Sequence, residues 1–217
     1  LENFAGYSGT QVNPLYEIYN YNSYDKSQYN EIVDNLLVNW NITKDFRMRL
    51  QMSATIRRET AELYKDPASA SYGNGSNIAM NGDKSLTSGD SNIIDGTLQL
   101  MYNKSIKKHY LNMNLSGNLR SSKYVTEYAD YRGFPGGDLT SPNYAAEIIN
   151  KPTRNDQRSR LLGFLLTGNY AWDNIYFADL TGRLDGSSEF GSNRRWSMFW
   201  APGAGINIHN YPILKHN

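Results

Sequence analysis

The sequence predicts an all-β fold, namely a segment of an antiparallel transmembrane β-barrel with about seven strands. Apolar and polar residues alternate along seven segments, short and long connections alternate between them, and aromatic residues gather near the ends of the apolar faces. The seven segments are residues 31–42, 45–57, 92–103, 109–122, 158–172, 174–186 and 195–209. Successive side chains of a strand point to opposite faces, so each segment has one apolar face and one polar or small face.

The first four segments show the alternation most clearly. In 31–42 and 45–57, the apolar positions are Ile32, Leu36, Val38, Trp40, Ile42, Phe46, Met48, Leu50, Met52, Ala54 and Ile56. In 92–103 and 109–122, they are Ile94, Leu98, Leu100, Tyr102, Leu111, Met113, Leu115 and Leu119. Polar or small residues fill the intervening positions, so these segments are predicted to be strands and not helices.

The last three segments follow the same rule. In 158–172 the apolar positions are Leu162, Phe164, Leu166, Tyr170 and Trp172, although Leu161 and Leu165 blur the pattern. In 174–186 and 195–209 they are Tyr176, Ala178, Leu180, Leu184, Trp196, Met198, Trp200, Ala204, Ile206 and Ile208.

The connections are unequal in length. Those within 42–46, 103–109 and 172–175 suit tight hairpins, whereas Ala61 to about Ser91 and Tyr124 to about Gln157 are long and polar. Residues 1–30 have a similar composition, and 187–194 is a compact member of the long set. Soluble domains rarely contain structureless loops beyond about 12–15 residues, whereas outer-membrane barrels combine short periplasmic turns with long external loops.

Aromatic residues mark both ends of the apolar faces. Those beside the short turns are Trp40, Phe46, Tyr102, Tyr170, Trp172 and Tyr176, and those nearer the opposite edge are Trp196 and Trp200. Aromatic girdles of this kind lie at the two interfaces of a membrane barrel. A soluble β-sandwich would also alternate, but its loops would be short. Seven strands are too few for a bacterial barrel, so residues 1–217 are predicted to be part of one larger barrel domain.

Composition excludes several other functions. The mean hydropathy is −0.64, and no apolar run approaches the length of a membrane-spanning helix. A net charge of +1 gives no nucleic-acid footprint, and the absence of Cys excludes thiolate metal sites. The three histidines, His109, His209 and His216, are not placed to activate Ser187 or Ser188, so no catalytic residue and no cofactor is predicted.

Loop oxygens offer a calcium site as an alternative to simple solvation. Asp83, Asp90 and Asp95, or Asn74 and Asn77, carry suitable oxygens, but none follows the regular calcium-loop spacing. No metal site is therefore predicted.

The segment 183–200 is the most distinctive part of the chain. Asp185 and Ser187 or Ser188 are predicted to cap backbone N–H groups in a tight hairpin, with backbone freedom from Gly186 and Gly191. Arg183 and Arg195 are on the polar faces of adjacent strands, where they can pair with Asp185. A structural role is favoured over ligand binding.

This segment resembles the SusC/RagA-like TonB-dependent transporters. The similar residues are Arg183, Asp185, Gly186, Ser187, Ser188, Phe190, Gly191, Asn193, Arg195, Phe199 and Trp200. Weaker similarity covers Gly117, Asn118, Arg120, Gly133, Phe134, Pro135, Arg160 to Gly163, and Tyr170. The resemblance implies a 22-stranded barrel of which this chain is a middle slice, with the plug domain and the TonB box outside it.

The resemblance also implies a function. It is TonB-dependent import of an oligosaccharide or oligopeptide across the outer membrane of a Gram-negative bacterium, together with a SusD-like surface lipoprotein. The residues predicted to face the lumen, and possibly a substrate, are Arg47, Arg49, Arg57, Asn112, Asn114, Asn118, Arg120, Asp179 and Thr181. They could equally pair with each other or with the plug. A siderophore or vitamin receptor and a non-transporting barrel or adhesin are the alternatives.

Overall fold

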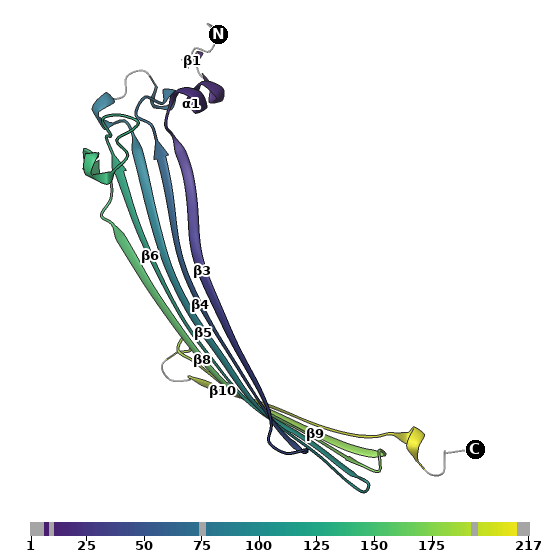
Figure 1. Ribbon diagram of the computed structural model, residues 1–217. Helices are drawn as coiled ribbons and strands as arrows, with labels where there is room; N and C mark the ends of the chain where they lie inside the picture. The colour runs from purple at the N-terminus through teal and green to yellow at the C-terminus, as the bar shows by residue number, and fades with distance from the viewer. Residues whose placement is uncertain (1–6, 9–10, 74–76, 192–194, 212–217) are drawn as a thin grey trace. The chain divides into compact units, whose positions relative to one another are not determined.

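The computed structural model describes residues 7–8, 11–73, 77–191 and 195–211, most of which form one antiparallel sheet (Figure 1). The strands of the sheet are β3 (Tyr24–Asn41), β4 (Phe46–Lys65), β5 (Asp83–Ile106), β6 (His109–Arg132), β7 (Glu147–Ile148), β8 (Thr153–Trp172), β9 (Tyr176–Ser187) and β10 (Trp196–Ile206). Their order is β10-β9-β8-β6-β5-β4-β3, with the two-residue β7 paired to β6. The prediction of an all-β fold with seven main strands is confirmed.

The remaining elements are short. Strands β1 (Tyr7–Ser8) and β2 (Gln11–Val12) pair with each other. Within the described residues, the helical elements are α1 (Pro14–Asn20) and four 3₁₀ turns, η1 (Ala70–Tyr72), η2 (Ile78–Met80), η3 (Pro142–Tyr144) and η4 (Ile208–Asn210). Asn13 caps α1, because its side-chain oxygen accepts from the backbone N–H of Leu15 at 3.1 Å. No helix in the described ranges is long and apolar enough to cross a membrane.

The strands extend well beyond their predicted ends. The expected links 61–91 and 124–157 contain the last residues of β4 and β6 and the first residues of β5 and β8, which leaves connections of 66–82 and 133–152. Residues 24–30, expected to be loop, begin β3. Polar residues occur on both faces of these extensions, so no sustained apolar alternation marks them as strands. Backbone hydrogen bonds to neighbouring strands hold them instead.

Tight turns join the strands at one end of the sheet. Lys107 has φ of 52°, and Asp173 and Asn174 have φ of 55° and 54° in the turn between β8 and β9. Asp and Asn tolerate this left-handed conformation better than most residues. In the turn from β3 to β4, the hydroxyl of Thr43 accepts from the N–H groups of Asp45 and Phe46.

The apolar face forms a belt of nearly constant length. It runs from Phe46 to Ile56 in β4, which is 11 residues, and from Leu111 to Leu119 in β6, which is 9 residues. A tilted strand needs about 9–11 residues to cross the hydrocarbon of a bilayer. Nothing in the described chain covers this face, since Met198 and Trp200 are 73% and 70% exposed.

The chain divides into two compact units. Unit 1 comprises residues 1–31, 57–91 and 124–157, and unit 2 comprises 32–56, 92–123 and 158–217. Unit 2 contains the apolar belt and the tight turns, whereas unit 1 contains the long connections. Most of the buried apolar residues described lie in unit 1, where Tyr64 is 1% and Phe134 is 2% exposed, whereas Ile175 is buried in unit 2. Phe134 packs edge-on against Tyr64, with ring centroids 5.4 Å apart.

Candidate functional site

The polar face of unit 2 consists largely of hydrogen-bonded pairs between neighbouring strands. Arg47 donates from Nε to Asn41 Oδ1, and Arg49 donates from Nε to Asn39 Oδ1, both at 2.9 Å. These arginines lie on β4 and their partners on β3, so adjacent strands present their polar side chains to the same side.

The pairs continue along the sheet. Asn112 of β6 donates to Asn103 of β5, and Arg120 lies 3.6 Å from Asp95. Further along, the side-chain amide of Asn169 donates to Asp179 at 2.5 Å. The predicted lumen residues of unit 2 therefore lie among polar neighbours that satisfy much of their hydrogen bonding.

Three other predicted lumen residues have different surroundings. Asn118 faces Gly163, where a Cβ would lie 2.6 Å from Asn118 Oδ1 and 2.7 Å from Asp185 Oδ1. Thr181 pairs in register with Thr167 on one side and Ala201 on the other. Asn114 Oδ1 is buried and has no hydrogen-bond partner among the residues described.

Arg57 belongs to unit 1, where it is the centre of a small charged group. Its guanidinium lies 3.0 Å from Glu59, 3.7 Å from Glu31, and 4.3 Å above the ring of Tyr29. Arg57 is thus held by two carboxylates and an aromatic ring, and its positive charge is largely compensated by these neighbours.

Serine hydroxyls fix the hairpin that contains the distinctive motif. Ser187 Oγ accepts from the backbone N–H of Glu189 at 3.1 Å, and Ser188 Oγ accepts from the N–H of Arg160 at 2.9 Å. The N–H of Ser188 also donates to the carbonyl of Arg160 at 2.9 Å. Ser188 therefore links the end of β9 to β8 through both its backbone and its side chain.

Asp185 has a different role from the predicted cap. Its carboxylate accepts from Arg183 Nε at 2.6 Å, an ion pair along one face of β9. Arg195 contributes its backbone carbonyl, which accepts from the N–H of Ser187 at 3.1 Å. Phe190 is exposed, and Asn193 lies outside the described residues.

The backbone of Gly186 and Gly191 is not in the left-handed region that favours glycine. Neither has a positive φ, and the positive-φ glycines of the described chain are Gly73, Gly82 and Gly133. Gly186 lies in β9 opposite Trp196, and a Cβ there would be 2.8 Å from the indole ring. Gly186 is needed for close approach of the ring and not for a turn.

A second cluster, which the sequence patterns did not reveal, joins three connections in unit 1. Asp66 is buried and accepts from the backbone N–H of Asn22 at 2.9 Å and from that of Ala68 at 2.8 Å. The side chain of Asn22 donates to the carbonyl of Gly137 at 3.0 Å, and Tyr64 donates to that of Gly136 at 3.3 Å. The segment before β3 is therefore tied to both long connections. We call these contacts, together with the neighbouring contacts of Tyr24, Glu62, Lys84, Tyr72, Asp83 and Arg132 described next, the loop cluster.

The loop cluster contains a nearly buried lysine. Lys84 Nζ lies 3.2 Å from Glu62 Oε2 and donates to the carbonyl of Thr140 at 2.9 Å. The hydroxyl of Tyr24 donates to the same Glu62 oxygen at 3.2 Å. A buried ammonium requires such partners, because an unpaired charge away from water is costly.

Burial changes the acidity of two tyrosines here. Burial, and secondarily the charge of Asp66, raises the pKa of Tyr64 to about 12. Burial together with the hydrogen bond to Asp83 raises the pKa of Tyr72 well above its usual range. Asp83 is also held by Arg132 at 3.1 Å. All these groups are locked into contacts with one another, so the loop cluster is a structural element.

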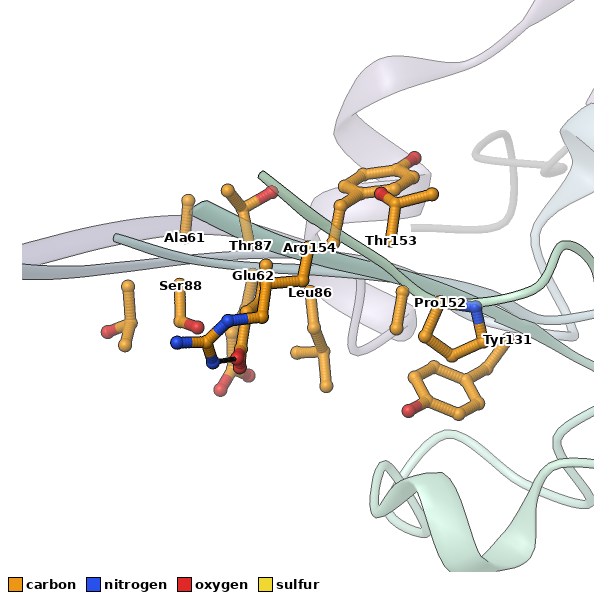
Figure 2. A pocket seen from close by; sticks show the side chains of 13 residues that line it. Ala61, Glu62, Leu86, Thr87, Ser88, Tyr131, Pro152, Thr153 and Arg154 are labelled. Atoms are coloured by element: carbon orange, nitrogen blue, oxygen red, sulfur yellow. Dashed lines mark hydrogen bonds and ion pairs between the residues drawn. The ribbon is translucent and has the colours of Figure 1, made fainter. Parts of the chain in front are cut away.

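Unit 1 has a surface hollow of about 550 Å³ beside the loop cluster. Glu62, Leu86 and Arg154 project from one side of the strands, and Ala61, Thr87 and Thr153 from the other (Figure 2). Arg154 forms an ion pair with Glu127, and Glu62 is the other charged residue that lines the hollow.

The residues considered for catalysis or calcium binding have structural contacts. His109 Nδ1 lies 2.6 Å from the Tyr170 hydroxyl, in a row of rings that continues to Trp172 and Tyr176. Asp90 pairs with Arg58. No group of three or more His, Cys, Asp or Glu side chains suited to a metal is found in the described part of the chain. Asn74 and His216 lie outside it.

Comparison with solved structures shows which known fold this sheet resembles. A structure of the RagAB peptide transporter matches with a TM-score of 0.76 and 20% identity, covering 90% of this chain and 22% of that chain. The fold is that of part of a RagAB transporter. The RagAB peptide importer matches in its closed-closed state at TM-score 0.76, and in its open-open state at TM-score 0.77 with 19% identity over 95% of this chain.

The match to RagAB confirms the predicted resemblance at the level of fold. The chain spans only 22% of the length of the RagAB chain in each case. No protein-family model and no curated protein matches this sequence.

Proposed function

We propose that this chain is a wall segment of a SusC/RagA-like TonB-dependent transporter in the outer membrane of a Gram-negative bacterium. The observation that supports it most is the match of the sheet to RagAB over 90% of this chain. The 9–11-residue apolar belt suits a lipid-facing surface, and the opposite face suits a hydrated lumen.

The polar face fits the passage of a polar polymer fragment. Many of its arginines, asparagines and aspartates are already paired, as Arg49 is with Asn39 and Arg183 with Asp185. Such a surface offers many weak hydrogen bonds and no strong binding point, so a substrate can move along it. Arg47, Asn112, Asn118 and Arg120 are the residues we assign to this lining.

The external end carries the loop cluster in this proposal. A SusD-like lipoprotein acts there, and TonB acts on a plug that lies outside this chain. An oligopeptide is the substrate class to test first, because the matching structures are of a peptide importer, and an oligosaccharide is the second.

Uptake by cells that express the whole protein tests the proposal. We expect labelled oligopeptides or oligosaccharides to enter wild-type cells and not cells without the gene, and uptake to stop when TonB is deleted. A lipoprotein should copurify with the protein from outer membranes. TonB-dependent uptake of an iron chelate alone would establish a siderophore receptor. Uptake or adhesion that is independent of TonB would establish a passive pore or adhesin.

A further inference from the structure

A second hollow lies in unit 2, where the apolar belt ends near the motif hairpin. Its volume is about 660 Å³. Leu119 of β6, Leu162 of β8 and Trp196 of β10, which lie at this end of the apolar belt, provide apolar lining. This hollow, which we call the belt-edge hollow, is therefore continuous with the apolar face.

The absence of a side chain at Gly186 shapes the belt-edge hollow. Gly186 pairs in register with Leu162 on one side and Trp196 on the other, so the three residues form one row across the sheet. A Cβ on Gly186 would lie 2.8 Å from the Trp196 ring. The indole can therefore lie close over β9, and the hydrogen bonds between Ser188 and Arg160 fix the rim beside it.

The charge of this hollow is one-sided. Its charged lining residues are Arg120, Arg160 and Arg195, and no Asp or Glu is among the described residues that line it. Arg120 also belongs to the polar face through Asp95, and Arg195, predicted for the polar face, lies just before β10 and lines this hollow. Arg120 pairs with Asp95, but neither Arg160 nor Arg195 forms an ion pair with any residue in the described ranges. The hollow of unit 1 differs, because Arg154 and Glu127 neutralise each other there.

We propose that the belt-edge hollow binds a phosphate-bearing lipid of the outer leaflet, an inference that rests on the proposed membrane function. Arginine matches phosphate with charge and two parallel N–H donors, and the apolar floor matches an acyl chain. A free phosphate ion would use only the arginines and leave Leu119, Leu162 and Trp196 without a partner. The position at the end of the apolar belt is where lipid headgroups lie.

Native mass spectrometry of the whole protein, purified and reloaded with lipid, tests the site. The probes are vesicles of phosphatidylcholine alone and vesicles of phosphatidylcholine with a minor fraction of lipid A. We expect retained lipid A on the wild-type protein. Retention should fall at least about tenfold in the double variant Arg160→Gln, Arg195→Gln, because two basic contacts to phosphate are lost.

The matched control removes two arginines elsewhere. Arg58→Gln with Arg154→Gln takes the same charge from residues that pair with Asp90 and Glu127, and it should keep lipid A retention within about twofold of wild type. Equal loss in both double variants would overturn the site and indicate a general charge effect.

Two further arms separate other occupants. Competition by excess inorganic phosphate alone, or equal retention of lipid A whose phosphates have been removed, would overturn the proposal. The proposal would also be overturned if the Arg160→Gln, Arg195→Gln variant lost a copurifying acidic protein but retained as much lipid A as the wild-type protein. Outer-membrane fractionation of the wild-type protein reports on the proposed function separately. If the wild-type protein is found in outer membranes but does not retain lipid A selectively, the lipid site is refuted and the proposed function is not.

Discussion

Lys84 reaches Glu62 at 3.2 Å from within the loop cluster, although the two side chains differ greatly in exposure. Lys84 is only 5% exposed, whereas the side chain of Glu62 remains partly in contact with water. The ammonium therefore depends on its partners more than the carboxylate does. The carbonyl of Thr140, which accepts from the same ammonium, ties the connection after β6 to this pair.

Lys84→Met should loosen the connection between β6 and β8. The change removes the donor to Thr140 and the counter-charge of Glu62, at a cost of about 1–3 kcal/mol in local opening. Glu62→Gln should open the connection further, because the nearly buried ammonium of Lys84 then keeps its charge without a counter-charge. Hydrogen exchange at the amide of Phe134, which donates to Asn81 at 2.9 Å, measures the opening. Equal exchange in the two variants would contradict the assigned asymmetry.

Gly133→Ala should disrupt the same connection. Gly133 has φ of 78°, and a Cβ would lie 2.6 Å from the Cβ of Ala146 and 2.9 Å from the carbonyl of Ala79. Strain and clash together should cost about 2 kcal/mol or more. Gly136→Ala is the control, since its Cβ would meet nothing within 4 Å and its φ is not positive. Limited proteolysis of the connection after β6 should separate the two variants, and similar cleavage of both would refute the steric argument.

Ser188→Ala should fray the junction of β8 and β9. The change removes the hydroxyl that accepts from the N–H of Arg160 and should cost about 1 kcal/mol locally. The amide of Arg160 should then exchange several-fold faster. Ser187→Ala is the comparison, because Ser187 accepts from Glu189 and should leave the Arg160 amide unchanged. An unaltered Arg160 amide in Ser188→Ala would show that the hydroxyl contributes nothing.

The loop cluster should open at high pH. The folded pKa of Tyr64 is raised from 10.0 to about 12, so the folded state holds this proton more tightly than the unfolded state. The stabilisation is complete below about pH 10 and is lost as the pH rises from about 10 to about 12. Tyrosinate absorbance during alkaline titration should show a late-ionising group in the wild-type protein. Tyr64→Phe should lose one such group while Tyr72 still ionises late, and identical titration curves would disprove the assignment.

Much of the fold was predictable, because apolar and polar residues such as Met48 and Arg49 alternate with a period of two. That period fits a strand and not a helix. The paired lining, with Arg49 on Asn39, follows from the same alternation once β3 and β4 are neighbours. Strand ends were not predictable. Residues 58–65 carry polar residues on both faces and no sustained apolar alternation, so pairing with neighbouring strands identifies them as part of β4.

The role of Gly186 shows the same limit. A glycine before two serines suggests a turn. The residue that requires glycine at position 186 is instead Trp196, which lies ten residues further along the chain and opposite Gly186 in the sheet, because its ring leaves no space for a side chain.

The sequence by itself determined the all-β class, the number of main strands and the two-sided character of the sheet, because these depend on local alternation alone. Only the tertiary structure decided the loop cluster of Asp66 and Lys84 and the one-sided charge of the belt-edge hollow. Asp66 and Gly137 lie far apart in sequence, and Arg160 and Arg195 belong to different strands. Contacts between such residues depend on the register and connections of the sheet, which no local pattern encodes.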